Sequence, residues 1–285
     1  MAPAGIHILQ VPSEVTEQAL IFADPKDVAS FAATCKTAYS LVYDSQDQHL
    51  WRHMYLAQSF DDPRKTLDPS GSGALRTSYD DWRCELQRRV RAVSITKNIN
   101  ERTLEERCEA LQTFMSVIMS TPPPSEVPSE SRSLQWLSDV IEQHNIFQRN
   151  SSPWTRSDEE TQLLARLRTH IGLSKDDQVG AHAVAMRTAA RCFVYDLRNY
   201  TQENHYGPFI PDSGGRVNWR HIEAVVNVIA MNLKDLEGLW EQTRPPIGLE
   251  ASRPYSAPGM GKRDPRDWAG VEGHWRRYVC FMDYR

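Results

Sequence analysis

The chain has 285 residues, of which 40% are hydrophobic and 25% charged, the proportions of an ordinary globular protein. Its formal net charge of −4 provides no basic field for nucleic acid, and no stretch approaches the about 20 apolar residues that a membrane span needs. No basic N-terminal run leads into an apolar core, and the five cysteines are scattered and odd in number, which favours free thiols. We therefore expect a cytoplasmic or nuclear protein that binds neither nucleic acid nor membrane.

The first predicted elements are short amphipathic helices. One begins at Pro12, and a second is capped by Asp24, because the residue before Pro25 avoids the helical region while proline suits a first helical turn. Third and fourth helices follow through 39–43 and 48–56. Isolated helices shorter than about 12 residues are marginal in water, so these must pack together and partly against another surface. The apolar residues of the first helix are Val15, Ala19, Leu20 and Phe22.

Helical periodicity resumes after a linker at 61–77 that is rich in Pro, Gly, Ser and charge. The helical region spans 78–242, and a Pro/Ser-rich segment at 121–133 is expected to break it. Within this region apolar residues recur every three or four positions, which is typical of amphipathic helices. The predicted helical stripes lie at 79–93, 104–118, 163–171, 179–197 and 218–236.

The last segment, 243–285, differs in composition. So many Pro and Gly residues occupy 243–267 that neither a helix nor a central strand can run through it. The terminal run HWRRYVCFMDYR at 274–285 is aromatic and β-branched, which favours a strand. A strand that stops at Arg285 has no partner of its own, so we expect the chain to be truncated there or to end on a sheet edge. The predicted fold class is mainly α, with a helical N-terminal module, a helical middle region and a mixed α/β C-terminal segment.

A characteristic series of residue types runs through the N-terminal module: Val11-Pro12, Glu14-Val15, Leu20, Pro25, Asp27-Val28, Phe31, Cys35-Lys36 and Leu50-Trp51-Arg52. This series resembles the F-box, a helical motif that docks on the Skp-family adaptor of cullin ubiquitin ligases, and we place the F-box at 8–60. Two residues depart from the family pattern, since Val11 replaces the usual leading Leu and Ala19 replaces a bulkier aliphatic residue. At about 0.8 kcal/mol per buried methylene, Ala19 is expected to weaken docking.

The resemblance implies a substrate-recognition subunit of a cullin-type (SCF) ubiquitin ligase, which binds the adaptor, and through it a cullin, and recruits a protein substrate. Transfer of ubiquitin would belong to other subunits, so the resemblance implies no catalytic residue, cofactor or metal. Trp51 is the expected anchor, because buried Trp residues often dominate interfaces. Alternatively Trp51 fills the core of the module itself, and Leu20 and Phe31 allow the same two interpretations. By the resemblance, the adaptor contacts are Val11, Pro12, Val15, Leu20, Pro25, Val28, Phe31, Leu50 and Trp51.

The remaining chain is similar, less specifically, to the downstream part of F-box proteins from basidiomycete fungi, in GPF at 207–209, NWRHIE at 218–223 and the segment 267–285. In those proteins the chain continues further, which also favours truncation at Arg285. The last segment supplies the substrate-binding candidates, because aromatic and Arg side chains are enriched at recognition hot spots. Alternatively, the aromatic rings form the core of a C-terminal sheet. The candidates are Trp268, Trp275, Arg276 and Arg277.

Other patterns point only weakly to chemistry. His49 and His53 have the four-residue spacing of helical metal ligands, but no third ligand is evident, so surface histidines are expected. Cys192 lies near His182 and His205 in sequence, which invites a thiol–imidazole nucleophile. On the apolar side of a helix, however, a thiol usually packs as a small inert side chain.

Two further sequence segments resemble functional motifs only weakly, and two alternative functions stay open. Gly261-Lys262 lacks the first Gly and the following Ser or Thr of a phosphate loop, and the run RRVR at 88–91 is expected to be a solvated helix face. One rival function is an enzyme, which would need an enclosed pocket of convergent titratable side chains in the helical body. The other is a scaffold that binds the adaptor without a role in ligation.

Overall fold

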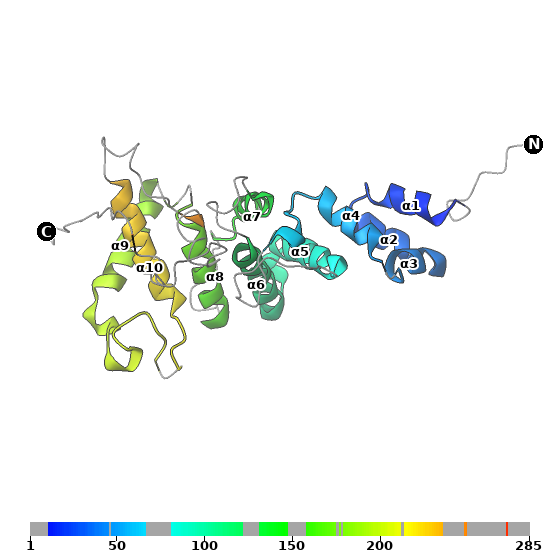
Figure 1. The fold of residues 1–285 in the computed structure, drawn as a ribbon. Helices are drawn as coiled ribbons and strands as arrows, with labels where there is room; N and C mark the ends of the chain where they lie inside the picture. The colour runs from blue at the N-terminus through cyan, green and yellow to red at the C-terminus, as the bar shows by residue number, and fades with distance from the viewer. Residues whose placement is uncertain are drawn as a thin grey trace, which may run out of the picture. The chain divides into compact units, whose positions relative to one another are not determined.

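The computed structural model describes residues 11–45, 47–66, 81–121, 131–147, 158–174, 177, 179–211, 214–235, 248–249 and 272. Within these ranges the chain is mainly helical, with ten α-helices (Figure 1). An isolated antiparallel bridge between Phe209 and Val217 is the only β pairing among them. The predicted mainly helical fold is therefore confirmed. The predicted terminal strand at 274–285 lies outside the described residues.

The chain divides into two compact units, and the division falls inside the helical region predicted at 78–242. The first unit contains helices α1 to α7, and the second contains α8 to α10. The predicted N-terminal module is thus part of a larger unit.

Four short helices form the N-terminal part of the first unit: α1 (Ser13–Leu20), α2 (Pro25–Ala32), α3 (Lys36–Tyr43) and α4 (His49–Ala57). As expected, the Asp24 side chain caps α2 by accepting a hydrogen bond from the Lys26 amide, at 2.8 Å, while Pro25 occupies the first turn. Helix α2 packs on α3, and α1 contacts both α3 and α4 (Figure 1). These helices supply the mutual packing that their short lengths require.

The core of these helices continues into α5 (Trp82–Lys97). The Trp51 indole donates to the Val42 carbonyl at 2.8 Å, and the rings of Tyr55 and Trp82 meet edge to face at 5.6 Å. Since α5 contributes to the same apolar cluster, the predicted module at 8–60 does not have a closed core of its own. The buried members of this cluster are Leu20, Ile21, Val28, Ala32, Val42, Leu50, Trp51, Met54, Tyr55, Phe60, Trp82 and Leu86.

Helices α6 (Leu104–Ser120) and α7 (Arg132–Gln143) complete the first unit. The predicted stripes at 79–93 and 104–118 correspond to α5 and α6, whereas the sequence analysis did not predict α7. Thr103 and Glu106 form a capping box at the start of α6.

The predicted linker at 61–77 begins with packed residues. Asp61 accepts hydrogen bonds from the Ser131 hydroxyl and the Arg132 amide, and so holds the start of α7. A single 3₁₀ turn, η2 (Pro63–Lys65), follows. The start of this segment therefore belongs to the first unit rather than to an exposed connection.

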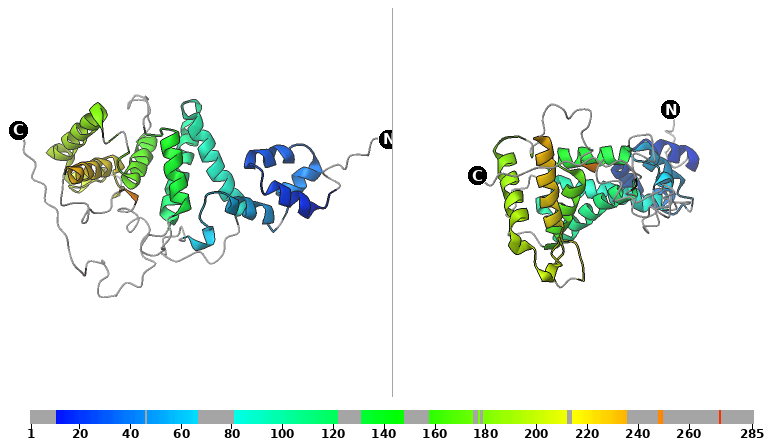
Figure 2. Two further views of the ribbon diagram at one scale, coloured as in Figure 1. Left: turned by 90° about the horizontal axis from the view of Figure 1, so that it is seen from above. Right: turned by 60° about the vertical axis from the view of Figure 1, so that its left-hand side comes forward.

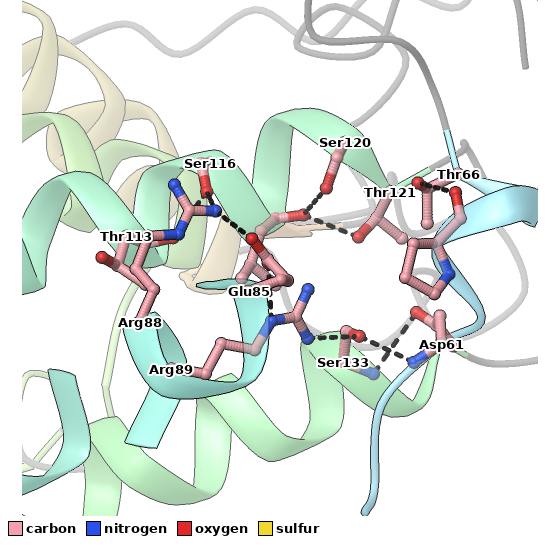
Figure 3. Close-up of polar contacts among 12 residues, drawn as sticks. Asp61, Thr66, Glu85, Arg88, Arg89, Thr113, Ser116, Ser120, Thr121 and Ser133 are labelled. Atoms are coloured by element: carbon pink, nitrogen blue, oxygen red, sulfur yellow. Dashed lines mark hydrogen bonds and ion pairs between the residues drawn. The ribbon is translucent and has the colours of Figure 1, made fainter. Parts of the chain in front are cut away.

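Arg89 of α5 is the main exception to the predicted solvated face at 88–91, because its side chain is buried, with 4% of the residue exposed. Its Nε donates to Glu85 at 2.9 Å and its Nη1 to the Ser133 hydroxyl at 3.1 Å (Figure 3). The guanidinium also lies over the Phe60 ring, 4.6 Å from its centroid, and faces two further rings, those of Tyr55 and Trp136. The prediction was wrong for Arg89 because a local charge run does not reveal a partner that lies 44 residues away in sequence.

The second unit is built from α8 (Asp158–Ile171), α9 (Gly180–Tyr195) and α10 (Trp219–Lys234), as the periodicity predicted. Helix α10 lies beside both α8 and α9 (Figures 1 and 2). Arg168 of α8 pairs with Glu223 of α10 at 3.4 Å. Burial raises the pKa of Glu223, although Arg168 opposes this shift.

A second polar contact ties the segment after α9 to α10. The Tyr200 hydroxyl donates to the Val194 carbonyl at 2.8 Å, so it accepts from Nε2 of His221 at 3.0 Å. Burial lowers the pKa of His221, and the hydrogen bond requires only that its Nε2 carries a proton. The α9–α10 pair is thus fixed by a Tyr–His contact in addition to apolar packing.

Replacing Arg89 with Met should destabilise the first unit by about 2–4 kcal/mol, because hydrogen bonds to a charged group and the cation–π contacts are lost together. The matched control is Arg91→Met on the same helix, which removes an exposed pair with Glu109 and should cost less than about 1 kcal/mol. Urea denaturation of both variants measures the change in the free energy of unfolding. Equal effects of the two substitutions would contradict the structural role of Arg89.

His170 of α8 should make the second unit acid-sensitive. Burial, assisted by Arg166, lowers its pKa from 6.5 to about 4. Because the folded-state pKa is depressed, its contribution is complete above pH 6.5 and is lost as the pH falls towards 4. At 1.36 kcal/mol per pKa unit the loss is about 3 kcal/mol. The free energy of unfolding should therefore decline less between pH 7.5 and pH 4 in His170→Gln than in the wild type, and equal declines would refute this assignment.

Candidate functional site

Helix α1 has one buried side and one exposed side that carries apolar side chains. Thr16 and Leu20 are buried against the rest of the first unit. Val15 is 55% exposed, Ala19 is also exposed, and Phe22, just after the helix, is 81% exposed. The spacing of four and then three residues places these three side chains on one side of α1. We call Val15, Ala19 and Phe22 the α1 outer face.

The rotation of α1 is set by its buried side. Leu20 and Ile21 belong to the apolar cluster shared with α5. Pro12 is the N-cap residue of α1, and its carbonyl accepts hydrogen bonds from the amides of Val15 and Thr16 at 3.1 and 3.2 Å. Because Leu20 and Ile21 face the cluster, the outer face points away from it. Single exposed apolar residues are ordinary, but several large ones on one face mark interaction surfaces.

The nine predicted adaptor contacts fall into three groups in the structure. Four are core residues, and Trp51 in particular combines burial with its hydrogen bond to Val42. The side chains of Trp51 and Leu20 therefore lie in the core of the first unit, as the alternative interpretation of these residues expected. The groups are the buried Leu20, Val28, Leu50 and Trp51, the half-buried Val11, Pro25 and Phe31, and the exposed Pro12 and Val15.

In the N-terminal helices, the exposed aromatic residues Phe22 and Tyr39 were not among the predicted contacts. Phe22 could have been included, since it lies on the apolar face predicted for the first helix. Tyr39 of α3 is 53% exposed, and its ring lies 4.9 Å from Tyr43, which stacks in turn on Trp51 at 5.7 Å. Only the packing of α3 reveals that Tyr39 faces outwards while its neighbours extend the core.

Several charged or titratable groups lie where α1 meets α4. Glu17 approaches Nδ1 of His49 at 3.6 Å. Burial lowers the pKa of His53, and the nearby His49 and Arg52 lower it further. A hydrogen bond from Ser45 lowers the pKa of Asp47. The three side chains of the outer face are apolar, and the charged contacts described here involve other residues of α1 and α4.

The other candidate sites receive little support. Cys192 is exposed on α9, so the expectation that it lies on the apolar side of the helix was wrong. His182 contacts Asp177 at 3.2 Å, and His205 occupies a left-handed turn with φ of 56°. Across the described ranges no three His, Cys, Asp or Glu side chains cluster so as to hold a metal ion. Gly261-Lys262 and the substrate candidates Trp268, Trp275, Arg276 and Arg277 lie outside the described residues.

Comparison with known proteins adds no relative. No protein-family model matches the chain, and neither a curated protein nor a solved structure is significantly similar to it. In the part of the chain that the structure describes, no helix has the length and apolar character needed to cross a membrane. The F-box interpretation thus stays a prediction that depends on the motif and on the surface of α1.

The difference between the two sides of α1 can be tested by stability. Phe22→Ser should change the free energy of unfolding by less than about 0.5 kcal/mol, because an exposed ring has few contacts to lose. Leu50→Ala, in the buried cluster, should cost about 2–5 kcal/mol. Urea denaturation of both variants provides the comparison. A cost for Phe22→Ser as large as that for Leu50→Ala would show that Phe22 is packed.

Proposed function

We propose that the α1 outer face docks on a Skp-family adaptor, and that the chain is a non-catalytic substrate-recognition subunit of a cullin-type ubiquitin ligase. The single observation that carries this proposal is the exposure of Val15, Ala19 and Phe22 on a helix whose other face is buried. The residue series that resembles the F-box runs through the same helix. The F-box-like residue series and the exposed α1 outer face therefore both favour a docking site at α1.

The structure also suggests how the predicted contacts divide their roles. The exposed Pro12 and Val15, with Phe22, are available for direct contact with an adaptor. The buried residues Leu50 and Trp51 instead support α1 from beneath. Fully burying a large apolar side chain contributes about 1.5–3 kcal/mol, so Val15 and Phe22 together could supply a substantial part of the binding free energy. The small side chain of Ala19 adds little, in keeping with the weakening expected at this position.

In this function the chain acts through proximity. Binding a substrate and the adaptor at the same time raises the effective concentration of substrate near the ubiquitin carrier without chemistry from this chain. Substrate recruitment would then belong to the residues beyond the first unit. The candidates Trp268, Trp275, Arg276 and Arg277 remain proposals for that contact.

Adaptor binding is tested by co-expression with a Skp-family adaptor and size-exclusion chromatography. A one-to-one complex is expected with the wild type, and Val15→Asp and Phe22→Asp should each weaken it about tenfold to a hundredfold, since tenfold in affinity corresponds to 1.4 kcal/mol. The matched control is Leu197→Asp in the second unit, because Leu197 is 82% exposed, as Phe22 is. Trp51→Asp is unsuitable, since a buried charge would unfold the first unit.

Two results would contradict the proposal. One is separate elution of the wild-type chain and the adaptor when both are folded. The other is co-elution of Val15→Asp and Phe22→Asp at the wild-type level. A loss of binding in Leu197→Asp as well would place the adaptor contact elsewhere.

A further inference from the structure

Two imidazoles lie side by side on the solvent-facing side of α4. The ring centroids of His49 and His53 are 4.4 Å apart, and both residues are exposed. Leu50 and Met54, each one position further along, are buried in the apolar cluster, and this fixes the rotation of α4. The histidine pair is therefore held at the surface by the packing of its own helix.

A carboxylate from another helix faces one of these rings. Glu17 of α1 lies 3.6 Å from Nδ1 of His49. This distance is too long for a hydrogen bond, so Glu17 acts on His49 through its negative charge. Glu17 thus places a carboxylate beside the histidine pair without the hydrogen bond that orients many metal-binding histidines. The sequence alone did not reveal it, because Glu17 is 32 residues away from His49 in a different helix.

We propose that His49 and His53 bind a divalent transition-metal ion through their ring nitrogens, with the negative charge of Glu17 nearby favouring the bound cation. Imidazole ligands suit Cu²⁺, Ni²⁺ and Zn²⁺, and Cu²⁺ should bind most tightly. The remaining coordination positions belong to water, since no third protein ligand converges there among the described residues. The site is thus an open one, with two protein ligands and weaker binding than a closed four-ligand centre.

The electrostatic surroundings are compatible with this assignment. The negative charge of Glu17 favours a bound cation, whereas Arg52 opposes it. A metal ligand must bind through a neutral imidazole, so binding of a metal ion releases any proton that the ring carries. Proton competition should therefore weaken binding as the pH falls below the histidine range.

The test is isothermal titration calorimetry of the full chain without an affinity tag, with Ni²⁺, Zn²⁺ and Cu²⁺ used separately. One equivalent should bind, and His49→Gln or His53→Gln should each lower that affinity at least about tenfold. The matched control is His182→Gln. His182 is similarly exposed, with 58% of its side chain accessible against 47% for His49, and it also faces a carboxylate, yet no second imidazole lies one turn away.

The role of Glu17 is tested separately. Glu17→Gln should weaken Ni²⁺ binding by up to about tenfold, because it removes a negative charge from beside the bound cation. The unfolding temperature without metal should change little, because a partly exposed pair at 3.6 Å contributes little by itself. A purely structural role for Glu17 would instead lower that temperature and leave the affinity intact.

Clear outcomes would overturn the inference. The first is the absence of a one-equivalent site in the wild type, and the second is wild-type affinity in both His49→Gln and His53→Gln. Binding that is lost equally in His182→Gln would show general histidine affinity rather than a paired site. Metal bound by exposed thiols would appear equally in all variants, so only the difference between variants counts. None of these measurements depends on adaptor binding.

Discussion

The first unit depends on how one buried positive charge is satisfied. The guanidinium of Arg89 is removed from water, and an isolated ion would be very costly there. Glu85 neutralises it from the same helix, while Ser133 brings in the start of α7 (Figure 3). Asp61 donates its amide to the same Ser133 hydroxyl, at 2.9 Å. One charge therefore determines how α5, α7 and the chain after α4 meet.

This arrangement explains why the N-terminal helices are not a self-contained module. The aromatic rings that surround Arg89 come from α4, from the segment after it and from α7. Their apolar cluster extends from Leu20 of α1 to Leu86 of α5. Helix α1 lies at the margin of this cluster and contributes only one of its faces. The apolar side chains of its other face are exposed, which is the physical basis of the proposed docking site.

Polar groups are also used inside the second unit. Arg168 and Glu223 join α8 to α10, and His221 with Tyr200 joins α10 to the segment after α9. Such contacts specify one arrangement of helices more strictly than apolar packing does, because a displaced helix would leave buried polar groups unpaired. Their pKa shifts, upward for Glu223 and downward for His221, follow directly from burial.

Local physical chemistry, read from the sequence, was sufficient for most helices. The three-to-four-residue spacing of apolar side chains, the position of Pro25 and the Asp24 cap all depend on residues close together in the chain. These local features correctly located α2, α5, α6 and α10. Helix α7 was missed, because its first residues lie in a Pro/Ser-rich segment that locally favours a break. The apolar residues of α1 were also identified, but their division into Leu20 inside and Val15 and Phe22 outside was not. Tertiary packing alone decided that division, the burial of Arg89 and the approach of Glu17 to His49, because each depends on residues distant in the chain whose positions no local pattern encodes.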